Sequence, residues 1–325
     1  MPSLNTVGQP SDEIRIGVSR CLMGEHVRYD GGHKRSAFVT GTLAPFVRYI
    51  PVCPEVEMGM STPREAIRLM RGEDGPRLIG LKTETDYTSD MREFAKVRAE
   101  ELRNLDLHGY ILKKDSPSCG LYRVRVYGTG GAPSRDGRGS FASALADSIP
   151  DLPMEEEGRL NDPALRENFI ECVFAYQRLK AMFSGTWRTG DLVAFHTAEK
   201  FLLLAHDTKT YAELGRLVAG AKGTARKGVA RDYRSLFMRA LARPATTRKH
   251  TNVLQHMAGH LKKLLDADSK AELHQVIEDF RLGLVPLVVP VTLFRHFVRL
   301  HDVPYLANQT YLSPHPKELM LRNHV

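Results

Sequence analysis

The stretch IRIGVSRCLMG, residues 14–24, joins a short apolar run to a loop that carries a cysteine. Two later stretches repeat this arrangement, VRYIPVCPEVEMG at residues 47–59 and GYILKKDSPSCG at residues 109–120. Short apolar runs that are bounded by polar or turn residues are typical of β-strands. We therefore predict three strands, each followed by a cysteine-bearing loop. The predicted strands are residues 14–19, 47–52 and 109–112.

Helical periodicity separates and follows these strands. Residues 86–107 and residues 139–149 both place apolar side chains at roughly helical spacing. In the first segment these side chains are Met91, Phe94, Val97, Leu102 and Leu105. Alternating strands and helices favour a mostly parallel sheet with flanking helices, so we predict an α/β fold for the N-terminal half.

The pattern changes in IPDLPMEEEGRLNDP, residues 149–163, which is rich in proline and acidic residues. The rest of the chain has helical periodicity and few strand signals, and this predicts an all-α C-terminal domain. The predicted organisation is a disordered tail (1–11), a first domain (12–155), a linker (156–162) and a helical domain (163–325).

Several protein classes are excluded by simple counts. No run of eighteen apolar residues exists, so we expect neither a membrane span nor a membrane partner. Residues 1–13 lack the basic and apolar regions of a secretory signal. Four cysteines in 325 residues are too few for a disulfide scaffold. We expect a cytoplasmic protein, a monomer or small homo-oligomer, whose cysteines have another purpose.

Three of the cysteines, Cys21, Cys53 and Cys119, each follow a predicted strand. Ligand sites in open parallel sheets form outside the carboxyl ends of the strands, so we expect the three to converge. Turn-forming residues beside them suit loops that wrap closely around a bound object. These residues are Gly24, Pro54 and Gly120.

Three thiolates at one site suit a soft metal, either zinc or an iron–sulfur cluster. Structural zinc usually takes four protein ligands from paired cysteines, and the first domain offers neither a pair nor a fourth cysteine. A cubane cluster held by three thiolates keeps one iron open to substrate. The alternative is that the three are unrelated cysteines buried in the core. For Cys172, which lies in an apolar helical segment, we favour such a core role.

An acid and a hydroxyl lie close in sequence to two of these cysteines. Glu55 is two residues from Cys53 and could activate water or shuttle protons. Ser116 is three residues before Cys119 and could hydrogen-bond the substrate or the departing sulfur. For Glu57 we favour a solvent-facing or helix-capping role.

The remaining polar residues of these loops have more ordinary interpretations. Residues 30–32, Asp-Gly-Gly, predict a turn, and Asp115 and Ser118 are turn candidates around Pro117. Structural and phosphate-binding roles are equally open for Arg28, Lys34 and Arg35.

Together, SRCLMG, YDGGHKR, CPEVEMG with STPRE, and KKDSPSCG resemble the thiouracil desulfidase family over roughly residues 12–155. The later segments HTAEKFLLLAH, NVLQHMAGHLKK and GLVPLVVPVTLFRH resemble a YbgA-like helical domain over residues 163–325. The two domains in one chain resemble a fused bacterial desulfidase that acts on 4-thiouridine in tRNA.

The resemblance implies a [4Fe-4S] cluster bound by Cys21, Cys53 and Cys119, with one open iron. It also implies Glu55 as the catalytic acid and Ser116 as the active-site serine. The implied reaction is non-redox: a thiophilic iron polarises the carbon–sulfur bond, water activated by Glu55 attacks the ring carbon, and hydrosulfide is released.

The charge of the chain is concentrated in its C-terminal half. Residues 161–325 carry 24 Lys and Arg against 15 Asp and Glu, whereas residues 1–160 carry 22 against 23. This asymmetry suggests a polyanionic partner such as tRNA, although a solvated basic surface is the alternative. Candidate contacts are Lys222, Arg226, Lys227, Arg231, Arg234, Arg248, Lys249, Lys262 and Lys263. His256 and His260 are spaced i,i+4, and we favour packing or RNA contact over a metal site for them.

Three other functions remain open from sequence. The same chemistry could act on free thiouracil or thiouridine, with the helical domain serving assembly. The chain could be an RNA-binding protein with a structural cluster. It could also be a hydrolase with zinc bound by three thiolates.

Overall fold

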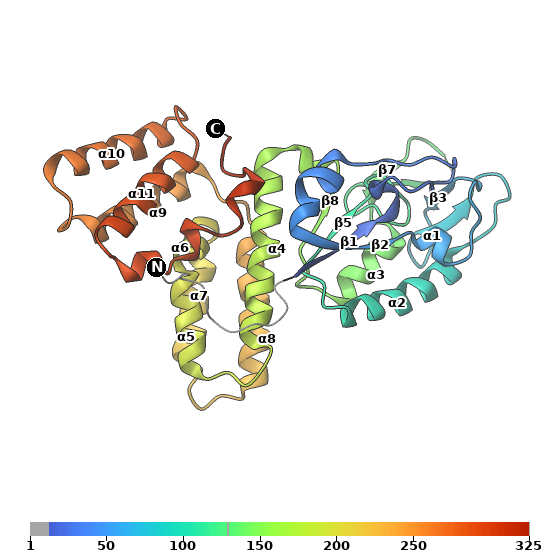
Figure 1. The fold of residues 1–325 in the computed structure, drawn as a ribbon. Coiled ribbons are helices and arrows are strands. Elements are labelled where there is room, and N and C mark those ends of the chain that lie inside the picture. The colour runs from blue at the N-terminus through green and yellow to red at the C-terminus, as the bar shows by residue number, and fades with distance from the viewer. Residues whose placement is uncertain (1–12, 129, 325) are drawn as a thin grey trace. The chain divides into compact units, whose positions relative to one another are not determined.

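The structure is a computed structural model, and it describes residues 13–128 and 130–324. The chain divides into two compact units, Met1–Gly158 and Arg159–Val325 (Figure 1). The tail predicted at residues 1–11 lies outside the described residues.

The first unit is built on a four-stranded parallel sheet in the order β2-β1-β5-β8. Its strands are β1 (Ile14–Ser19), β2 (Val47–Val52), β5 (Gly109–Leu112) and β8 (Met154–Glu156). The register of β1 and β2 runs from Ile14 opposite Val47 to Ser19 opposite Val52, so their carboxyl ends are level. The predicted parallel sheet and its three cysteine-preceding strands are confirmed.

Two helices, α2 (Thr88–Asn104) and α3 (Ser140–Ser148), pack against each other in this unit (Figure 1). The buried face of α2 consists of Met91, Ala95, Ala99 and Leu102. Val97 and Leu105, which the sequence assigned to the same apolar set, are exposed. The predicted helix is confirmed, and small alanines, rather than these two larger residues, complete its packed face.

A second four-stranded sheet, ordered β4-β3-β6-β7, was not predicted. Its central pair β3·β6 is parallel and its outer pairs are antiparallel. The strands are β3 (Ile67–Met70), β4 (Arg77–Gly80), β6 (Val124–Tyr127) and β7 (Ser134–Gly137). Short one-turn elements carry the loops between strands: η1 (Arg20–Met23), η2 (Phe38–Leu43), η3 (Ala44–Phe46) and α1 (Pro54–Glu57).

The first residues of the predicted linker, 156–162, are part of the first folded unit. Glu156 belongs to β8 and accepts hydrogen bonds from the main-chain N–H groups of Leu121 (2.8 Å) and Tyr122 (3.1 Å). Glu157 forms an ion pair with Lys113. The acidic run looks like a linker in sequence, but it is folded into the first unit because its carboxylates satisfy polar groups there.

The second unit is all helical in the part of the chain that the structure describes, which confirms the predicted fold class. Asp162 begins it by capping α4, accepting hydrogen bonds from Ala164 N (2.9 Å) and Leu165 N (3.1 Å). The helices are η4 (Arg159–Asn161), α4 (Pro163–Phe183), α5 (Thr189–Ala198), α6 (Lys200–His206), α7 (Thr208–Ala219), α8 (Arg226–Leu241), α9 (Thr247–Leu261), α10 (Ala267–Arg281), α11 (Val288–Leu300), α12 (Pro304–Ala307), η5 (Thr310–Leu312) and η6 (Lys317–Leu319). None of the described helices has both the length and the apolar character needed to cross a membrane.

Candidate functional site

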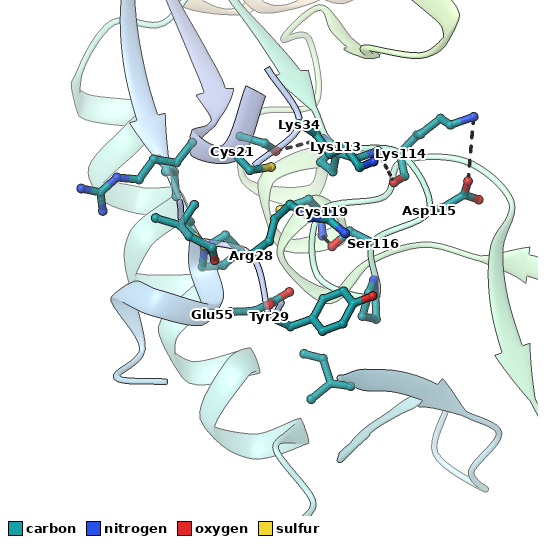
Figure 2. Close-up of a pocket in the computed structure, with 18 of the residues that line it drawn as sticks. Cys21, Arg28, Tyr29, Lys34, Glu55, Lys113, Lys114, Asp115, Ser116 and Cys119 are labelled. Carbon is teal, nitrogen blue, oxygen red and sulfur yellow. Dashed lines mark hydrogen bonds and ion pairs between the residues drawn. The ribbon is translucent and has the colours of Figure 1, made fainter. Parts of the chain in front are cut away.

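The three cysteine loops of the first unit meet at one cavity of about 390 Å³, which we call the cysteine cavity. Cys21, Cys53 and Cys119 all line it, together with Glu55 and Ser116. Figure 2 shows Cys21, Cys119, Glu55 and Ser116 around this space. The structure therefore brings together all five residues that the sequence proposed for the site.

Cys21 is placed by the tight turn that follows β1. It lies in η1, which ends at Gly24 with a φ of +97°, a conformation that favours glycine. The carbonyl of Cys21 also accepts a hydrogen bond from Lys34 N (2.9 Å). The turn thus fixes the cysteine immediately beyond the end of its strand.

Cys53 is the N-cap residue of α1, and the side chain of Glu57 caps the main-chain N–H of Cys53. The Cys53 N–H donates to Glu57 Oε1 (3.0 Å), and Glu57 Oε2 forms an ion pair with Arg98 Nε (3.0 Å). The capping role favoured for Glu57 is confirmed. The thiol of Cys53 lies 3.8 Å from the Val27 carbonyl oxygen, which ties the second cysteine loop to the first.

Cys119 is held by a turn built around Ser116. The Ser116 hydroxyl oxygen accepts hydrogen bonds from Ser118 N (3.3 Å) and Cys119 N (3.1 Å). Gly120 follows, and a Cβ there would lie 2.4 Å from Val124 and 2.7 Å from the Ser116 carbonyl oxygen. Only glycine fits this close approach, so the loop has one way to present the thiol.

The metal-free thiols of the cavity resist ionisation. Burial, reinforced by Cys53, raises the pKa of Cys21 to about 11, although Lys113 and Arg28 oppose the shift. Burial also raises the pKa of Cys53, and burial together with the Glu55 carboxylate raises that of Cys119 well above its usual value. Such thiols become thiolates when a metal displaces their protons.

Glu55 is the most constrained polar group at the cavity. Its Oε2 accepts hydrogen bonds from Arg64 Nε (3.0 Å) and from Arg64 Nη2, and its Oε1 accepts one from Ser118 Oγ (2.8 Å). The side chains of Arg64 and Glu55 are only 4% and 13% exposed, and Ser118 is fully buried. Arg64 and Ser118 were missed as site residues: the only sequence signal for Arg64 was its place in STPRE, and Ser118 was interpreted as a turn residue.

Several cations contribute to the rest of the wall of the cysteine cavity. Arg28, Lys34, Lys113 and Lys114 belong to its wall, and Lys113 Nζ donates to Glu157 Oε1 (2.5 Å). The Asp30-Gly31-Gly32 turn is confirmed by the hydrogen bond from Gly31 N to the Arg28 carbonyl (3.0 Å) and by the φ of +75° at Gly31. Arg35, the third cation proposed there, donates instead to Thr40 Oγ1 (3.1 Å) and does not line the cavity.

Within residues 13–128 and 130–324, no three histidine, cysteine, aspartate or glutamate side chains are arranged to hold a single metal ion. Neither the cysteine cavity nor the surroundings of His256 and His260 contain such an arrangement among these residues. His260 packs against Tyr305 instead, with ring centroids 4.8 Å apart. Cys172 is buried on α4 and donates to the Leu241 carbonyl (3.3 Å), so its interpretation as a core cysteine is confirmed.

The basic residues proposed for the second unit are mostly at its surface. Arg231 forms an ion pair with Asp232 (2.8 Å), and Lys249 is bonded through Nζ to the His206 carbonyl, so both have other partners. The Arg234 side chain is half-buried. The exposed candidates are Lys222, Arg226, Lys227, Arg231, Arg248, Lys262 and Lys263.

Comparison with known proteins assigns both units to families. The family described as 2-thiouracil desulfurase matches residues 16–157, which include all three cavity cysteines. YbbK of Bacillus subtilis (strain 168), an uncharacterized protein, is 34% identical over 110 residues, which cover 32% of this chain and 72% of YbbK. The chain belongs to the 2-thiouracil desulfurase family.

The second unit of this desulfurase-family chain matches a family of unknown function, DUF1722, over residues 200–316. YbgA of Escherichia coli (strain K12), also uncharacterized, is 29% identical over 152 residues, or 46% of this chain and 90% of YbgA. Among solved structures, a [4Fe-4S]-dependent thiouracil desulfidase, TudS, is 28% identical and aligns with 47% of this chain and 97% of its own length, at a TM-score of 0.40.

Proposed function

We propose that this chain is an iron–sulfur-dependent desulfidase that converts 4-thiouridine in tRNA to uridine and releases hydrosulfide. The observation that carries this proposal is the meeting of three cysteine thiols and one anchored carboxylate, Glu55, at a single cavity. Membership of the 2-thiouracil desulfurase family supports a thiolated uracil as the substrate.

The donor set of the cavity fits a [4Fe-4S] cluster. Cys21, Cys53 and Cys119 would hold it, because a cubane takes thiolate ligands and offers a separate iron to each. Structural zinc usually takes four protein ligands, and the cavity offers three cysteines. Three thiols leave the fourth iron without a cysteine, as an open catalytic position requires.

When bound, the cluster would supply a thiophilic Lewis acid that polarises the carbon–sulfur bond and accepts the sulfur. Glu55 would take a proton from the water that attacks the ring carbon. The new carbon–oxygen bond replaces the carbon–sulfur bond, and the sulfur leaves with the bonding electron pair as hydrosulfide, so no electron donor is needed. The Ser116 hydroxyl accepts two main-chain hydrogen bonds, which leaves its own proton free to donate to the substrate.

The cavity wall suits a nucleotide. Its volume of about 390 Å³ lies in the range of small-molecule sites, about 300–1,000 Å³. Lys34 supplies positive charge for phosphate, and the half-exposed Tyr29 ring offers a stacking surface. Arg28 and Lys114 add charge to the same wall, although each also lies within ion-pair distance of an aspartate, Asp30 (3.3 Å) or Asp115 (3.9 Å). A base in tRNA would have to leave its stack to enter.

The exposed cations of the second unit would bind the rest of the tRNA, because neutralisation of phosphates supplies most of the sequence-independent affinity. Lys222, Arg226 and Lys227 lie at and before the start of α8 and are exposed. Replacing the three with alanine is expected to lower the slope of log affinity against log salt by about 1 for each lost phosphate contact. Lys82→Ala, at an exposed position of the first unit, is the matched control. An unchanged slope would identify the three cations as solvated charges.

The deciding experiment is anaerobic incubation of the cluster-reconstituted protein with 4-thiouridine-containing tRNA, followed by mass spectrometry of the nucleosides. We expect loss of 4-thiouridine, an equal gain of uridine and an equal yield of hydrosulfide. Parallel incubations contain free 4-thiouridine and free thiouracil. Conversion of these alone would move the substrate from tRNA to small molecules, and no conversion of any substrate would eliminate the desulfidase.

A further inference from the structure

We propose that Arg64 and Ser118 are positioning residues that fix the Glu55 carboxylate from both sides, so that Glu55 acts through Oε1. The inference rests on the proposed function, because it assigns an orientation to the acid of that site. It adds two residues and one reactive oxygen to what the family assignment provides.

The oxygen Oε2 has no acceptor capacity left. A carboxylate oxygen accepts about two hydrogen bonds, and Arg64 supplies two donors to this one, Nε at 3.0 Å and Nη2. Two donors from one planar guanidinium fix the position of Oε2, and the hydrogen bond from Ser118 to Oε1 sets the plane of the carboxylate. Neither water nor substrate can use Oε2 while this pair is intact.

The oxygen Oε1 retains one position. Ser118 donates its single hydroxyl proton to Oε1 at 2.8 Å and, being fully buried, does not exchange that bond for one to solvent. One lone pair of Oε1 remains for another donor. Because Ser118 directly precedes Cys119, the loop that presents a thiol also sets the direction of the acid.

Arg64 is itself anchored to the loop that follows Cys21 and to its own loop. Its Nη1 donates to the Val27 carbonyl (3.0 Å) and the Ser61 carbonyl (3.3 Å), and its main-chain N–H donates to the Tyr29 carbonyl (2.9 Å). The guanidinium therefore cannot follow a moving carboxylate. Glu55 is held as a pre-oriented group, the condition under which a fixed proton acceptor is most effective.

A structural role for Arg64 has to be separated from a positioning role, because removing one partner of a buried ion pair also destabilises the fold. A double-mutant cycle separates them. If Arg64 acts only through Glu55, replacing Arg64 should lower kcat in the wild-type protein but not in the Glu55→Gln variant.

The test measures kcat and KM for desulfidation by full-length, cluster-loaded Arg64→Met, Glu55→Gln and the double variant. Arg64→Met is expected to lower kcat by about 10- to 100-fold with KM within about twofold, because misplacement by about 1 Å costs up to about 100-fold. The double variant should be no slower than Glu55→Gln alone. Losses that multiply, or a kcat for Arg64→Met within twofold of wild type, would overturn the proposal. Arg71→Met, which removes an exposed arginine of the same unit, should leave both constants unchanged.

Two further measurements cover poor folding of Arg64→Met and failure of the proposed function. Ser118→Ala keeps the Arg64–Glu55 pair and should lower kcat by about tenfold, again without an additional loss in Glu55→Gln; an unchanged kcat contradicts the proposal. A crystal structure of Arg64→Met needs no turnover and should show the carboxylate turned away from Ser118. A carboxylate that keeps its wild-type position would refute the positioning role, whereas a wild-type enzyme inactive on every thiolated substrate would refute only the proposed function.

Discussion

Each unit of this protein contains a buried arginine–glutamate pair, and the two pairs have different purposes. In the first unit, Arg64 holds Glu55 at the wall of the cysteine cavity and leaves one lone pair of the carboxylate unused. In the second unit, Arg322 donates through Nη2 to Glu171 Oε1, and His206 Nε2 lies 3.2 Å from Glu171 Oε2. Each oxygen of Glu171 faces one buried protein group, Arg322 or His206.

The second pair, together with the groups around it, forms what we call the C-terminal clamp. Arg322 N donates to Glu167 Oε2 (2.9 Å), and Arg322 Nη1 donates to the Tyr311 carbonyl (2.7 Å). These bonds fasten the end of the chain to α4 and η5. An arginine–glutamate pair therefore closes the fold in the second unit and orients a reactive group in the first. Both glutamates line cavities, and the difference is that three cysteines line the cavity at Glu55, whereas no cysteine among the described residues lines the cavity at Glu171.

Replacing one cysteine in each unit should give the largest difference between the two units. Cys53→Ala should abolish cluster binding, measured as bound iron and visible absorption, and lower desulfidation by at least about 1000-fold, or about 4 kcal/mol of transition-state stabilisation. Cys172→Ala, which removes the buried thiol on α4, should change neither. Undiminished iron in Cys53→Ala, or lost iron in Cys172→Ala, would contradict the division of the cysteines between chemistry and packing.

Removing the arginine of the clamp should have the next largest effect. Arg322→Met is expected to lower the free energy of unfolding of the second unit by about 3–5 kcal/mol, because it leaves Glu171 buried and uncompensated. Urea denaturation followed by circular dichroism measures this, and kcat for free 4-thiouridine should be unchanged in the folded protein. Arg239→Met, which breaks an exposed pair with Glu213, is the control and should cost less than about 1 kcal/mol. A clamp variant as stable as this control would show that the buried pair does not secure the C-terminus.

The sequence predicted the framework of the site better than the contacts within it. The three strands before the cysteines were legible because each is a short, mostly apolar run. β1 and β5 are buried along almost their whole length, whereas β2, at the edge of the sheet, is only partly buried. The second sheet was missed because each of its strands has only four residues, and β7 (SRDG) carries no apolar pattern. The acidic strand β8 (MEE), whose last residue fell in the predicted linker, was missed for the same lack of an apolar pattern.

At the site, strand-end position predicted that Cys21, Cys53 and Cys119 would share one place, and Glu55 followed from its spacing to Cys53. No spacing rule predicts that Arg64, nine residues later, folds back onto Glu55, because the turn between them is set by tertiary contacts. Ser118 is a residue type common in turns, and only its complete burial against Glu55 distinguishes it.

The smallest predicted effect concerns Glu167, the second acid of the clamp. Burial and the neighbouring Glu171 raise the pKa of Glu167 to about 7, although Arg322 opposes the shift. The pKa of Glu171 moves the other way: burial opposes the change, but Arg322 and His206 lower it. Glu167 is therefore the acid of this pair that is protonated in the folded state between its ordinary pKa of 4.5 and about 7.

In that window the folded state binds more protons at Glu167 than the unfolded state does, so this group makes the protein less stable as pH rises from about 4.5 to 7. Below the window the unfolded state is also protonated, and the contribution of Glu167 is constant. His250 acts in the opposite direction, because burial lowers its pKa from 6.5 to about 3 and its contribution to stability is lost as pH falls below 6.5. The wild-type profile alone therefore mixes two opposing slopes.

Glu167→Gln isolates the effect, because an amide mimics the protonated acid at every pH. Between pH 5 and pH 8 the variant should gain about 2 kcal/mol of unfolding free energy relative to wild type, measured by urea denaturation at each pH. Parallel profiles for the two proteins would mean that Glu167 is ionised throughout and that the clamp tolerates two buried carboxylates.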